Sequence, residues 1–171
     1  MLEHLSMNSR IRPAVVEDTP AILELIHALG EFEKLAHEVV ATEDNLRKFI
    51  FGAKPAAEVL ICELKDPASG KWTNAGFALF FTSFSTFLGL PGIYLEDLFI
   101  KPEARSSGLG KKMLVELARL TLDRGYGRLE WSVLDWNVRA RKFYEELGAK
   151  PMDEWTVHRV SGDSLQDLAK F

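Results

Sequence analysis

The chain has 171 residues, of which 47% are apolar and 27% are charged, and its formal net charge is −4. This length is typical of one domain, and the apolar fraction is sufficient for a buried core. The small acidic charge disfavours nucleic acid as a partner, because phosphate binding requires clustered Lys and Arg. We therefore expect a single domain over residues 1–171, with residues 1–8 flexible, and a charge compatible with a cationic substrate.

Cysteine content and hydropathy favour a cytoplasmic protein. Cys62 is the one cysteine and ends the apolar run Val59-Leu60-Ile61-Cys62. It has no internal disulfide partner, and we interpret it as a buried hydrophobe rather than a nucleophile. No apolar stretch reaches the roughly 20 residues that span a membrane, and the N-terminus lacks a signal-peptide core. We expect no metal site, because the histidines lack ligand spacing: His4, His27, His37 and His158.

The first half of the chain predicts an initial strand, two helices and then three strands. The strand is expected at residues 9–15. A helix follows from Asp18, since apolar residues recur at i, i+3, i+4 and i+7: Ile22, Leu25, Ile26 and Leu29. Thr42 begins a second helix with an imperfect cap, because Asn45 replaces the usual Glu or Gln. The three strands are predicted at residues 57–64, 72–84 and 93–100.

The second half predicts a helix at residues 108–124, a strand at 129–134, a helix at 137–147, a strand at 154–160 and a short closing helix. Gly125 and Gly148 end the two longer helices. Three strands in succession do not fit a plain βαβ repeat. We therefore expect an α/β fold with a mixed, mostly antiparallel central sheet of about six to seven strands flanked by helices.

The segment Arg105-Ser106-Ser107-Gly108-Leu109-Gly110 lies between a predicted strand and a predicted helix. Such a turn aims backbone N–H groups at one point, and the helix dipole adds partial positive charge there. Its glycines let an anion approach the backbone, since they have no Cβ. Its arginine adds a cation. Lys111 and Lys112 lie in the first helical turn, where the helix dipole disfavours a positive charge, and a bound polyanion would account for them.

Two familiar nucleotide motifs do not fit this loop. A P-loop would need Gly at position 105 and Ser or Thr at 112, where Arg105 and Lys112 stand. A dinucleotide fingerprint starting at Gly108 would need Gly or Ala at 113, where Met113 stands. From the loop alone, an anion site and an ordinary strand-to-helix turn with solvated lysines both remain open.

Arg105-x-x-Gly108-x-Gly110 resembles the Q/R-x-x-G-x-G/A pattern of GNAT acetyltransferases, in which this loop holds the pyrophosphate of acetyl-CoA. The resemblance extends over nearly the whole chain. Ile11-Arg12-Pro13-Ala14 is similar to the first strand of the family, and Tyr94-Leu95-Glu96-Asp97-Leu98-Phe99 to the strand where acetyl-CoA docks. The segment from Asn137 to Ala149 is similar to its cofactor-facing helix.

Within this family the chain most resembles the spermidine/spermine, or diamine, N-acetyltransferases, and among these the branch that prefers thialysine and related small amines. Three stretches carry this resemblance: Glu31-Phe32-Glu33-Lys34-Leu35, Tyr94-Leu95-Glu96-Asp97 and Val133-Leu134-Asp135-Trp136-Asn137. Together they are far more specific than the loop. The resemblance implies acetyl-CoA as donor, a small-molecule amine as acceptor, and a homodimer.

Acetyl transfer requires a base for the ammonium and a proton for the departing thiolate. The resemblance assigns the first role to Glu96, directly or through a water. Its position among apolar residues predicts burial, which would raise its pKa. The alternative is a carboxylate that only attracts or orients the ammonium. Asp97 faces the other way in a regular strand, although a bulge can redirect either side chain.

The resemblance assigns the role of general acid to Tyr144, whereas helical periodicity alone favours a core position for it. Asn137 is a predicted N-cap that, by resemblance, also binds the pantetheine arm. The backbone of Leu98, Phe99 and Ile100 is expected to pair with pantetheine as an added strand, with the N–H of Leu98 or Phe99 polarising the acetyl carbonyl. The remaining implied cofactor contacts are Arg105, Ser106, Ser107, Gly108, Leu109, Gly110, Lys111, Arg139, Ala140 and Tyr144.

The acceptor site is implied by positional match, and an ammonium prefers carboxylates and aromatic faces. Its candidates are Phe32, Glu33, Glu96, Glu130, Trp131 and Asp153. One departure from the family concerns the size of the acceptor. Polyamine-acetylating members carry an Asp and a Trp before the docking strand, whereas Phe84-Ser85-Thr86-Phe87-Leu88-Gly89 contains no acid. A long polycation would lose one anchor, so we expect a shorter amine.

These observations predict an N-acetyltransferase that moves an acetyl group from acetyl-CoA to a primary amine by direct attack. Thialysine, a lysine-like amine, a diamine or a polyamine are the expected acceptors. Two alternatives stay open at this point. One is a related enzyme that acts on an amino acid, an aminoglycoside or a protein N-terminus, and the other is a CoA-binding module that senses or scaffolds without catalysis.

Overall fold

The computed structural model describes residues 8–171, so the flexibility expected for residues 1–7 lies outside the described part of the chain. The chain forms two compact units, one ending at Ser132 and the other comprising Val133–Phe171. A single domain over residues 1–171 stays a prediction.

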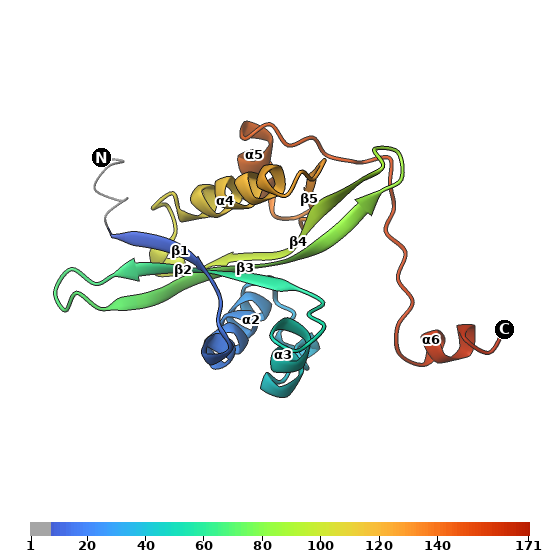
Figure 1. Ribbon diagram of the computed structural model, residues 1–171, viewed down its shortest axis with the longest axis horizontal. Helices are drawn as coiled ribbons and strands as arrows, with labels where there is room; N and C mark the ends of the chain where they lie inside the picture. The colour runs from blue at the N-terminus through green and yellow to red at the C-terminus, as the bar shows by residue number, and fades with distance from the viewer. Residues whose placement is uncertain (1–7) are drawn as a thin grey trace. The chain divides into compact units, whose positions relative to one another are not determined.

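The first unit is built on a five-stranded sheet in the order β1-β2-β3-β4-β5. The strands are β1 (Ser9–Pro13), β2 (Glu58–Lys65), β3 (Trp72–Ser85), β4 (Leu90–Ile100) and β5 (Leu129–Trp131). Neighbours run antiparallel except β4 and β5, which are parallel. Helices α2 (Thr19–Glu33) and α3 (Glu43–Ile50) cover one face, and α4 (Leu109–Asp123) covers the other (Figure 1). The predicted mixed α/β fold is confirmed.

The sheet has fewer strands than the six to seven predicted. The predicted strand at 129–134 ends at Trp131, and residues 154–160 form no strand. That segment is exposed throughout and pairs with no strand among the residues described. An alternating pattern makes a strand only where a second strand supplies backbone partners, and this condition is not visible in a local pattern.

The apolar stripe predicted for the first helix faces the core. Ile22, Leu25 and Leu29 of α2 are buried against the sheet, and Ile26 packs at the edge of the same cluster. The sheet contributes the side chains that alternate toward this face: Val59, Ile61, Phe77 and Phe99. The predicted cap of α3 also forms, since the Thr42 hydroxyl accepts the N–H of Asn45 at 3.3 Å. Local patterns therefore predicted both helices on this face.

Strand β4 contains a bulge at Glu96. Asp97 pairs with Leu79 of β3 and Leu95 pairs with Phe80, so Glu96 is an extra residue between them. Because side chains alternate along a strand, one extra residue reverses the alternation after it. Asp97 and Phe99 therefore lie on the α2 face of the sheet, the face that Tyr94 also occupies before the bulge.

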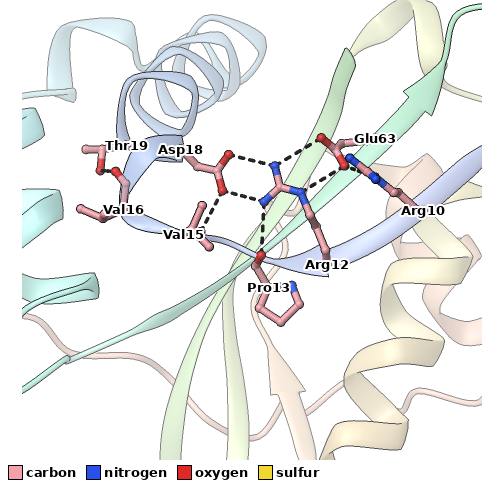
Figure 2. Close-up of polar contacts among 8 residues, drawn as sticks. All are labelled: Arg10, Arg12, Pro13, Val15, Val16, Asp18, Thr19 and Glu63. Atoms are coloured by element: carbon pink, nitrogen blue, oxygen red, sulfur yellow. Dashed lines mark hydrogen bonds and ion pairs between the residues drawn. The ribbon is translucent and has the colours of Figure 1, made fainter. Parts of the chain in front are cut away.

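A charged network, which the sequence did not predict, fixes the start of α2 to the sheet (Figure 2). The Arg12 guanidinium on β1 donates two hydrogen bonds to Asp18, at 2.6 and 2.9 Å, and also bonds Glu63 of β2. Arg10 pairs with the same buried Glu63 carboxylate. Burial alone would raise the pKa of Glu63, but these two arginines outweigh it and lower that pKa. The network thus connects β1, β2 and the beginning of α2.

Three short 3-10 turns join the elements of the first unit: η1 (Val16–Asp18), η2 (Ala36–Glu38) and η3 (Pro102–Ala104). Cys62 is buried, as predicted, and burial raises the pKa of its thiol to about 11, which makes it unreactive at neutral pH. Within residues 8–171, no helix has both the length and the apolar character needed to cross a membrane.

The second unit contains helices α5 (Val138–Glu146) and α6 (Gly162–Leu168). Asn137 caps α5 as predicted, because its side-chain oxygen accepts the N–H of Ala140 at 3.2 Å. The rings of Phe143 and Tyr144 lie 5.4 Å apart on this helix. The sequence therefore predicted both the start of α5 and the helix at the end of the chain.

Candidate active site

The predicted anion loop lies between η3 and α4. Gly108 is the N-cap of α4 and has a φ of 78°, a left-handed conformation that favours glycine. It offers no side chain to cap the helix, so the amides of Leu109, Gly110 and Lys111 have no acceptor from a cap or within the helix. A Cβ placed on Gly108 or Gly110 would meet no atom within 4 Å. Open donors at a helix N-terminus fit a pyrophosphate.

Basic side chains around the loop have distinct partners. The Nε of Arg105 donates to the Ile100 carbonyl at 2.9 Å, and its guanidinium carbon lies 4.3 Å from the centroid of the Phe32 ring. Lys112 donates to the Ser9 hydroxyl at 2.8 Å, whereas Lys111 is exposed. The resemblance assigned Arg105 to the cofactor site and Phe32 to the acceptor site, but in the structure these two side chains are in contact.

The free edge of β4 begins beyond its short pairing with β5, which involves only Ile93, Tyr94 and Leu95. The Lys101 N–H donates to Ala75 of β3, and successive peptide groups point to opposite edges of a strand. The Phe99 peptide therefore faces β3, and a Cβ on Gly76 would lie 2.3 Å from its carbonyl oxygen. The peptide groups of Leu98 and Ile100 face the opposite edge. Of the two N–H groups considered for the acetyl carbonyl, this geometry favours that of Leu98.

Two carboxylates, Glu33 of α2 and Asp97 of β4, lie close together on the α2 face of the sheet. Burial, together with the charges of Glu96 and Glu33, raises the pKa of Asp97 to about 6. Burial also raises the pKa of Glu33. Glu96 is exposed, so the expectation that it is buried is wrong. The bulge causes this outcome, because it leaves Glu96 without a cross-strand partner and turns Asp97 toward α2.

Replacing Asp97 with Asn is expected to stabilise the protein at pH 8 by about 2 kcal/mol, because the buried charge is removed. A carboxyl whose pKa is raised by folding contributes stability below its unfolded pKa and loses it as pH rises through the folded value, here about 6. The gain of Asp97→Asn should therefore disappear near pH 4. Urea unfolding from pH 4 to 8 measures this gain in stability. Asp44→Asn, at an exposed position, is the control. A gain independent of pH would contradict this reading.

The two acceptor candidates on β5 face opposite sides of the sheet. Glu130 pairs with Tyr94 and Trp131 with Leu95, and paired residues share a face. Glu130 forms an ion pair with Arg128 at 2.7 Å. The Tyr94 hydroxyl lies 2.7 Å from that of Ser132, and its ring stacks on Phe81. The structure therefore places Glu130, but not Trp131, on the same face as Asp97.

The remaining candidates belong to the second unit. Tyr144 is half-buried, and burial raises the pKa of its hydroxyl, which stays protonated at neutral pH. Ala140 is half-buried beside the Asn137 cap, whereas Arg139 and Asp153 are exposed. Among residues 8–171, no cluster of three or more His, Cys, Asp or Glu is arranged to hold a metal ion.

Comparison with known proteins gives one family and several relatives. Residues 26–149 match the model of the acetyltransferase (GNAT) family. The chain is 39% identical to a thialysine N-epsilon-acetyltransferase of Bos taurus, over 93% of this chain and 96% of that protein. It is 36% identical to an L-ornithine N5-acetyltransferase of Arabidopsis thaliana, over 96% of this chain and 90% of the relative.

Among solved structures, the fold matches an integron cassette protein from the mobile metagenome of V. cholerae. The TM-score is 0.78 at 23% identity, and the match covers 96% of this chain and 99% of the other. At this identity the likeness supports the fold alone.

Proposed function

We propose that this chain, which belongs to the GNAT family of acetyltransferases, transfers an acetyl group from acetyl-CoA to the primary amine of a small molecule. The coarser assignment, an N-acetyltransferase of this family, follows from membership. The finer one rests mainly on one observation, the closeness of Glu33 at the end of α2 to Asp97 and its neighbour Glu96 on β4, whose charges act on one another. A concentration of negative charge attracts an ammonium group.

The donor end of the proposed site would be the loop from Arg105 to Lys111 and the free edge of β4. The open amides of Leu109, Gly110 and Lys111 suit the pyrophosphate, and the peptide groups of Leu98 and Ile100 suit the pantetheine arm. When bound, acetyl-CoA supplies an acetyl group activated as a thioester. The Leu98 N–H would then stabilise negative charge on the acetyl oxygen.

On the acceptor side, Glu96 would take the proton that the ammonium must lose before its nitrogen can attack. Its exposed position suits a proton path through water. Tyr144 would hold a proton for the departing sulfur, and its raised pKa keeps that proton in place at neutral pH. Glu33 and Asp97 would attract and orient the amine. We also propose a cytoplasmic homodimer, to which the exposed apolar side chains of Trp155 and Val157 are suited.

The acceptor is expected to be short. The segment without an acid, residues 84–89, comprises the end of β3 and the turn that leads to β4, and Phe84 and Phe87 are exposed there. An apolar turn offers no anchor to the distant ammonium of a polycation. We therefore expect a higher kcat/KM for thialysine, ornithine, lysine or putrescine than for spermidine.

A thiol-release assay with acetyl-CoA across these five amines tests the proposal. A clear preference for spermidine would contradict the expected size of the acceptor. Slow release with every amine would contradict the enzymatic proposal and favour a CoA-binding module.

A further inference from the structure

The side chain of Arg105 connects the donor loop to the end of α2. Its Nε donates to the Ile100 carbonyl at 2.9 Å, which fixes the guanidinium beside β4. The guanidinium carbon lies 4.3 Å from the Phe32 ring centroid and 5.6 Å from that of Phe99. The two rings are themselves 6.4 Å apart. An arginine stacked on an aromatic face is a favourable cation–π contact.

The backbone on each side of this contact adopts an uncommon conformation. Lys34 has a φ of 62° and Ser106 a φ of 64°, and they are the non-glycine residues with positive φ in the described chain. Ser106 follows Arg105 directly, and Lys34 ends α2 two residues after Phe32. Lys34 is the left-handed C-cap of α2, and local hydrogen bonds such as Leu35 N–H to the Gly30 carbonyl at 2.8 Å hold it, whereas Ser106 lies in the loop. Both positions flank the same stacked pair.

The end of α2 also carries Glu33, whose charge acts on Asp97 of β4. Any group that holds Phe32 in place therefore also holds Glu33 opposite the carboxylates of β4. A guanidinium can stack on an aromatic ring with its face and bond a phosphate with the N–H groups at its edge, which the ammonium of a lysine cannot do. One arginine side chain can thus serve both roles at once.

We propose that Arg105, through its stacking on Phe32, is a positioning residue for the amine acceptor as well as a part of the donor loop. The inference rests on the proposed function, because it concerns the binding of the amine. In this proposal the loop motif also holds the end of α2, which carries Glu33. Affinity for the amine then depends on a residue that the family pattern assigns to the donor.

Arg105→Lys keeps the positive charge and removes the planar group. We expect it to raise the KM for the amine about three- to tenfold, and any change in the KM for acetyl-CoA reports separately on the contact of the loop with phosphate. Phe32→Leu should raise the amine KM similarly, and the double variant should be no worse than Phe32→Leu alone. Arg119→Lys, on the exposed surface of α4, is the control and should change neither KM. An unchanged amine KM in Arg105→Lys, or additive effects in the double variant, would overturn the proposal.

A second measurement does not depend on activity. Urea unfolding of wild type, Phe32→Leu, Arg105→Lys and the double variant gives the coupling between the two side chains. If wild type acetylates no amine, the proposed function fails while this cycle still tests the contact. Additive unfolding effects would overturn the role of Arg105 whether or not the enzyme is active.

Discussion

Tyr144→Phe is expected to lower kcat about 100-fold or more, with little change in the KM for acetyl-CoA or the amine. The substitution removes only the hydroxyl, and a positioned proton donor contributes about 10²–10⁴-fold to such a reaction. An interaction made only in the transition state lowers kcat and kcat/KM together. Because burial raises the pKa of Tyr144, the wild-type hydroxyl keeps its proton throughout the neutral range.

Steady-state kinetics near neutral pH, with thialysine and acetyl-CoA, measures this effect. Tyr126→Phe is a suitable control, because it removes a half-buried hydroxyl whose neighbour is Thr82 at 3.4 Å. It should retain wild-type kcat. If Tyr144→Phe also keeps kcat within about threefold, Tyr144 is a packing residue of α5, as helical periodicity alone suggested.

Glu96→Gln is expected to lower kcat/KM for the amine about 100-fold near neutral pH. The glutamine keeps the shape of the side chain at the bulge and cannot accept the proton of the ammonium. If Glu96 is the base, kcat falls, and raising the pH recovers part of it, since more of the amine is then deprotonated in solution. If Glu96 only orients the ammonium, KM rises while kcat is maintained.

A pH profile of kcat and kcat/KM from pH 6 to 10 separates these two roles. Glu17→Gln, an exposed acid at the other end of α2, is the control and should match wild type. Near-normal kcat and KM in Glu96→Gln would remove Glu96 from the mechanism. In that case Asp97, the half-buried acid beside it, becomes the next residue to test.

Several elements of the fold are determined by local sequence. The apolar stripe of α2, the caps at Thr42 and Asn137 and the left-handed Gly108 each depend on residues within one turn of one another. Helix hydrogen bonds and caps join neighbours along the chain, so spacing alone predicts them. For the same reason the glycine loop was correctly placed at the start of α4.

Contacts between segments distant in sequence could not be predicted this way. The Arg12 network joins residues about 50 positions apart, from Arg12 to Glu63, and its one signal was an acid within an apolar strand opposite two arginines. The predicted strand at residues 154–160 lacked a partner among the residues described. The stacking of Arg105 on Phe32 depends on how α2 packs against β4.

The sequence by itself determined the loop, the docking strand and the resemblance that identified the family. Only the tertiary structure decided that Asp97 is half-buried while Glu96 is exposed, that Leu98 presents its N–H to the free edge, and that Trp131 faces away from Asp97. Each outcome depends on strand register, and one extra residue at Glu96 changes the face of every side chain that follows in β4. Register is set by pairing with β3 and by packing under α2, and these lie outside any local pattern.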